Sequence, residues 1–99
     1  MTETAIGAPA RNYIGGAWRT AASDETYEKH NPWRPSEVTG AFQASGADDA
    51  REAVAAAAAA FPGWSRLPAP ARAAYLGKAA DAIEARTERI AQDMTAEMG

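Results

Sequence analysis

Residue types that commonly carry enzyme chemistry are sparse in this sequence. It has one histidine, His30, and no cysteine. A general base needs a partner and a pocket, and His30 directly precedes an Asn-Pro pair, where a structural role is far more common than a catalytic one. Without cysteine the chain offers no disulfide, thiolate metal ligand or thiol nucleophile. We therefore expect no catalytic residue here.

Two groups of carboxylates are the next candidates. Metal sites need oxygen ligands that converge from several elements, whereas Asp48, Asp49 and Glu52 follow one another at the start of one predicted helix. Glu84 and Glu88 belong to a charged helix face. Such side chains are usually solvated or interact favourably with the helix dipole. No metal-binding residue is therefore predicted.

A glycine pair, Gly15-Gly16, is the only candidate for binding a phosphate. It lacks the G-x-G-x-x-G spacing of a dinucleotide-binding turn and the helix that should follow at once. A tight turn between short apolar runs is the favoured interpretation. No cofactor-binding residue is predicted.

Composition narrows the class of protein further. The 99 residues carry a net charge of −3, and the basic residues are dispersed along the chain, which argues against binding to nucleic acid. The longest apolar run, residues 53–61, has nine residues and falls short of the ~18 of a membrane span. Together with the lack of a signal-peptide pattern, this predicts a soluble, cytoplasmic chain without membrane contact. Much of the 46% hydrophobic content is alanine, so a thin core is expected.

The first half of the sequence predicts short strands. Residues 1–11 show no periodicity and are expected to form a flexible tail. Residues 12–19 predict either a strand with a tight turn or two short strands. Residues 26–30 predict a further strand, which ends at Asn31-Pro32. Residues 37–44 predict a third, weaker strand. We expect two or three strands in total.

The second half predicts two or three helices. Ser45 or Gly46 can cap the first, and Pro62-Gly63 is expected to end it. Its apolar face would comprise Ala50, Val54, Ala57, Ala58 and Phe61.

The second helix would carry Pro68 and Pro70 in its first turn. An apolar stripe follows at Leu76, Ala79, Ala80 and Ile83. Thr87 would cap a third helix unless the second runs straight through. The fold class predicted for the chain is α+β.

The order of these features resembles the beginning of the aldehyde dehydrogenases. The family's opening strand motif matches residues 13–18 (YIGGAW), its Asn-Pro strand matches residues 27–32 (YEKHNP), and its first helix matches residues 49–61. Trp64, Arg72 and residues 95–99 (TAEMG) follow in the family's order, although the family motif continues with Lys after the glycine. The resemblance implies that residues 12–99 are the N-terminal, incomplete part of an aldehyde dehydrogenase.

The resemblance also implies the properties of the complete enzyme. Its subunit would be α/β with a Rossmann-like cofactor domain, would form a homo-oligomer, and would oxidise an aldehyde to a carboxylic acid with NAD or NADP. A cysteine thiolate, an oxyanion hole and a glutamate-activated water carry that chemistry in the family. All lie downstream of the matched region, so this part is expected to be inactive alone, to bind no cofactor and to pack on the remainder of its subunit.

Some family members hold a monovalent cation next to the Asn-Pro strand. The matching positions are the backbone carbonyls of Lys29 and His30 and the carboxylate of Glu97, where an Asp is more usual. The resemblance implies this site for a complete enzyme only.

A second hypothesis comes from a different class of protein. The chain could be a complete, non-enzymatic helical interaction protein, with Trp18, Trp33 and Trp64 in its core or in a binding patch. An independent domain of this kind should melt cooperatively.

Overall fold

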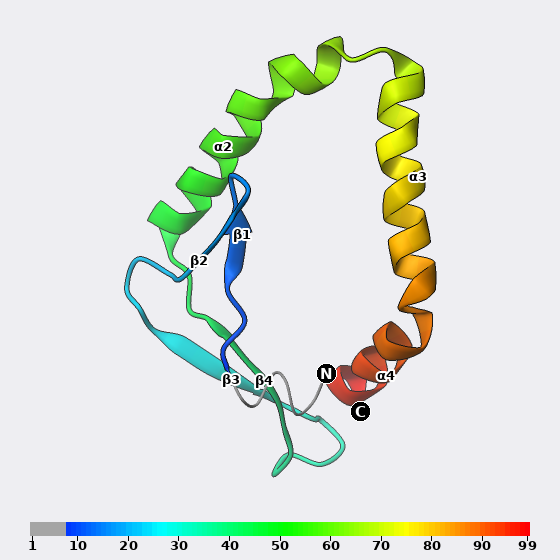
Figure 1. Cartoon of the computed structure of the whole chain (residues 1–99). Coiled ribbons are helices and arrows are strands. Elements are labelled where there is room, and N and C mark those ends of the chain that lie inside the picture. The colour runs from blue at the N-terminus through cyan, green and yellow to red at the C-terminus, as the bar shows by residue number, and fades with distance from the viewer. Residues whose placement is uncertain (1–7) are drawn as a thin grey trace.

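The computed structural model describes residues 8–99, so residues 1–7 of the predicted tail lie outside the described part. Two antiparallel hairpins precede three helices (Figure 1). This arrangement confirms the α+β class, but the described chain has four strands, where two or three were expected. The additional strand arises because the Gly15-Gly16 turn divides residues 12–19 into a hairpin of their own.

The first hairpin pairs β1 (Asn12–Ile14) with β2 (Ala17–Arg19). Gly15 and Gly16 have φ values of +61° and +80°, and a two-residue turn with left-handed backbone matches the twist of the strands that it joins. Tyr13 lies opposite Trp18, with their ring centroids 4.9 Å apart. Such cross-strand aromatic pairs stabilise a short hairpin.

The second hairpin pairs β3 (Thr26–His30) with β4 (Val38–Gln43) and carries an irregularity between Lys29 and His30. These bounds confirm the strands predicted over residues 26–30 and 37–44. Asn31 organises the connection because its side-chain Oδ1 accepts the backbone N–H groups of Trp33, at 2.8 Å, and of Arg34, at 3.3 Å. A short polar side chain that bonds to its own backbone in this way fixes a turn.

The first helix, α2, spans Ala47–Arg66, and Pro62 lies inside it. The prediction that Pro62-Gly63 ends the helix was therefore wrong. A proline inside a helix removes one backbone hydrogen bond, but the preceding alanine run has the highest helix propensity available and offsets part of that loss. The helix ends instead at Arg66, and the following residue, Leu67, is extended because it precedes Pro68.

The remaining helices are α3 (Ala69–Ala85) and α4 (Thr87–Met98). Of the two prolines predicted in the first turn of α3, Pro70 lies there, whereas Pro68 is the N-cap residue before the helix. A separate third helix is also confirmed, but Thr87 does not cap it. Its hydroxyl donates to the carbonyl oxygen of Glu84 at 2.8 Å, in the preceding helix, so Thr87 completes the end of α3.

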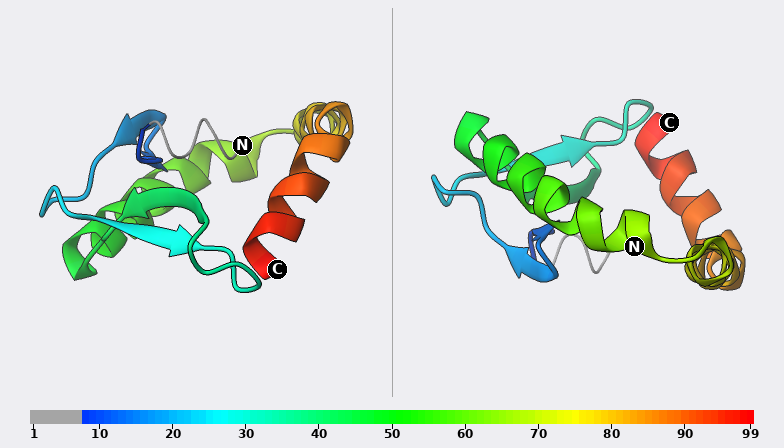
Figure 2. Two further views of the ribbon diagram at one scale, coloured as in Figure 1. Left: turned by 90° about the horizontal axis from the view of Figure 1, so that it is seen from below. Right: turned by 90° about the horizontal axis from the view of Figure 1, so that it is seen from above.

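The described chain forms an open arch. α2 packs on the first hairpin, where Ala56 lies near Gly15, while α3 stands apart from both hairpins (Figures 1 and 2). The radius of gyration is 16.6 Å, against about 13 Å for a compact chain of this length. Ala21 is the only apolar side chain buried among residues 8–99. The apolar core is therefore even smaller than the thin core that the composition predicted.

Two buried polar side chains, Asp49 on α2 and Gln43 on β4, fix the segments next to the strands by hydrogen bonds to their backbone. Asp49 accepts the N–H groups of Ala22, at 3.0 Å, and of Gly46, at 2.9 Å. Gln43 accepts the N–H of Ala21 at 2.8 Å and donates to the carbonyl oxygen of Ala10 at 3.0 Å. Each side chain therefore links two backbone segments that are distant in sequence, and Gly46 is the N-cap residue directly before α2.

Replacing Asp49 tests this arrangement. Asp49→Ala removes the acceptor of two backbone N–H groups, and a typical intramolecular hydrogen bond contributes about 0.5 to 1.5 kcal/mol of net stability. The amide protons of Ala22 and Gly46 should exchange with solvent markedly faster, as measured by hydrogen exchange NMR. Asp48→Ala is the matched control, because Asp48 is also an acidic first-turn residue but is exposed and pairs only with Arg51. Equal protection of both amides in the two variants would contradict the anchoring role of Asp49.

Candidate functional site

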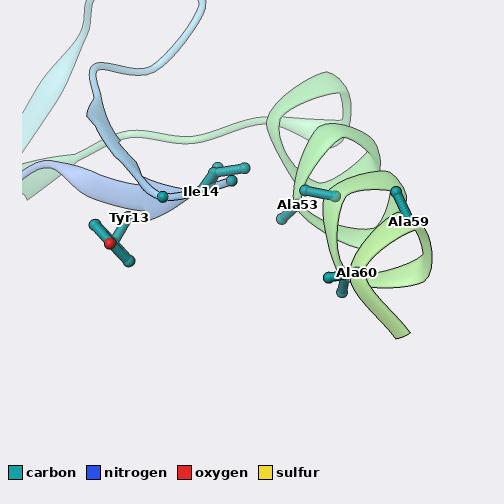
Figure 3. A pocket seen from close by; sticks show the side chains of 9 residues that line it. Tyr13, Ile14, Ala53, Ala59 and Ala60 are labelled. Atoms are coloured by element: carbon teal, nitrogen blue, oxygen red, sulfur yellow. The ribbon is translucent and has the colours of Figure 1, made fainter. Parts of the chain in front are cut away.

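An open groove lies between the first hairpin and α2. It has a volume of about 700 Å³ and is open to solvent. Figure 3 shows Ile14 on β1 pointing toward Ala53 on α2. The lining residues are Tyr13, Ile14, Gly15, Gly16, Ala53, Ala56, Ala57, Ala59 and Ala60. Tyr13 is the only lining residue with a titratable side chain, so the groove offers apolar contact and no acid–base pair.

Large apolar side chains are exposed along the arch. Val54 and Phe61, from the predicted apolar face of α2, are 68% and 63% exposed, because the helix meets the hairpin through the neighbouring side that carries Ala53 and Ala56. Leu76 and Ile83, from the predicted stripe of α3, are 65% and 61% exposed. Within the described chain no other element covers these side chains.

The residues of the implied cation site lie where two distant elements meet. Lys29, near the end of β3, and Glu97, near the end of α4, form an ion pair with Nζ and Oε1 3.8 Å apart. The Lys29 carbonyl oxygen accepts the Thr39 hydroxyl at 3.2 Å. The contact with Glu97 is thus made by the Lys29 ammonium, whereas the Lys29 carbonyl, the group implied as a cation ligand, accepts from Thr39. His30 is exposed and lies opposite Val38 in the hairpin.

The other carboxylates singled out by the sequence do not converge. Asp48 pairs with Arg51 at 2.8 Å, and Glu52 lies 3.5 Å from Arg19 on the first hairpin. Across residues 8–99, histidine and carboxylate side chains nowhere gather in threes as a metal ion would require. Sequence reasoning placed Asp49 among the helix-dipole carboxylates and missed its bonds to Ala22 and Gly46. Its position three residues after Gly46 was the signal that could have indicated the second of these bonds.

The helices give no indication of a membrane span. In the part of the chain that the structure describes, none of them is both long and apolar enough to cross a bilayer.

These observations describe a segment whose helices carry apolar side chains that no other element of residues 8–99 covers. The sequence model of the aldehyde dehydrogenase family matches residues 18–99. The chain therefore belongs to the aldehyde dehydrogenase family, which confirms the resemblance noted from its motifs.

The most informative relatives are semialdehyde dehydrogenases. The chain is 41% identical to an alpha-ketoglutarate semialdehyde dehydrogenase of Haloferax volcanii over 92% of its own length and 19% of that protein. Identity to an alpha-ketoglutaric semialdehyde dehydrogenase of Bacillus subtilis is 39%, over 89% of the chain and 18% of that protein. A malonate-semialdehyde dehydrogenase of Geobacillus thermodenitrificans is 38% identical over 90% of the chain and 18% of its own length. The chain thus spans about a fifth of the length of these relatives, and nothing in the comparisons supports the alternative of a small interaction protein.

Proposed function

We propose that this chain is the N-terminal structural part of an NAD(P)-dependent aldehyde dehydrogenase subunit. The observation that carries the proposal is the family match over residues 18–99, in a chain that spans about a fifth of its relatives' length. The exposed faces of α2 and α3 support it, because apolar patches of this kind in soluble proteins commonly mark surfaces that pack on other polypeptide. The covering polypeptide would be the remainder of the same subunit.

In this proposal the chain holds other parts of the subunit in place and supplies no reacting group. The aldehyde would be attacked by a cysteine thiolate, as in the family, and this chain has no cysteine. The two hairpins and α2 would instead form a preassembled edge, joined by Asp49 and Gln43, on which the cofactor domain is completed. The complete subunit would have the Rossmann-like cofactor domain of the family, would form a homo-oligomer and would reside in the cytoplasm.

The names of the relatives suggest the class of substrate. Alpha-ketoglutarate semialdehyde and malonate semialdehyde both carry a carboxylate in addition to the aldehyde. We therefore propose a carboxylate-bearing semialdehyde as substrate of the complete enzyme. The residues that select it would lie outside residues 1–99.

An enzyme assay tests the function. The full reading frame that encodes this chain should produce a protein that forms NADH or NADPH from alpha-ketoglutaric or malonate semialdehyde, followed by absorbance at 340 nm. The 99-residue chain, assayed in parallel, should form neither above the rate of the blank. Failure of the complete protein to oxidise any aldehyde with either cofactor would overturn the proposed activity. Turnover by the 99-residue chain alone would overturn its structural role.

The cation site remains a proposal for the complete enzyme. There the carbonyl oxygens of Lys29 and His30 and the carboxylate of Glu97 would contribute ligands to a monovalent cation. Exchange of potassium chloride for tetramethylammonium chloride at equal concentration should then lower the melting temperature, because the bulky ion cannot replace the bound one. An unchanged melting temperature would contradict the binding of a stabilising monovalent cation at this site.

A further inference from the structure

We draw no further inference here: the strongest candidate, the open apolar groove between the first hairpin and the side of α2 that carries Ala53 and Ala56, carries none because nothing in the structure shows what covers it.

Discussion

The arrangement of the strands and the first helix depends on the bonds that Asp49 and Gln43 make to backbone amides. In most domains a packed apolar core holds the elements together, but here Ala21 is the only buried apolar side chain of the described residues. Asp49 instead joins Ala22 to Gly46, and Gln43 joins Ala21 to Ala10. Hydrogen bonds of this kind define geometry well but add little net stability each. The chain thus has a specified shape without the apolar burial that would stabilise it.

Membership of the aldehyde dehydrogenase family gives this imbalance a simple explanation. The chain spans about a fifth of the length of its relatives. In the proposed enzyme, the remainder of the subunit would bury the apolar area on α2 and α3. The wide arch and the large radius of gyration agree with this explanation, because a segment shaped to receive other elements need not be compact by itself. Its contribution to the proposed enzyme would be to position other elements, not to react.

The sequence allowed much of the fold to be predicted, because local patterns dominate it. The strand at residues 26–30, the third helix and the glycine turn of the first hairpin all follow from neighbouring residues. Pro62 was misjudged because helix propensity over twenty residues competed with one proline. The bonds that Gln43 and Asp49 make to residues more than twenty positions away could not be derived, since no local pattern encodes which distant amide a side chain will meet. The expectation that the chain carries no catalytic residue came from composition alone and stays a prediction, whereas membership of the family required the order of several weak motifs.

Differential scanning calorimetry of the 99-residue chain tests the central claim most directly. A compact domain of about 100 residues absorbs roughly 60 to 80 kcal/mol in one sharp, reversible transition. With so little apolar burial, this chain should show a broad transition with a much smaller enthalpy. A sharp, reversible transition with the full enthalpy would show that residues 1–99 form a stable domain by themselves. It would contradict the claim that their exposed apolar faces are stabilised by packing on the remainder of a subunit.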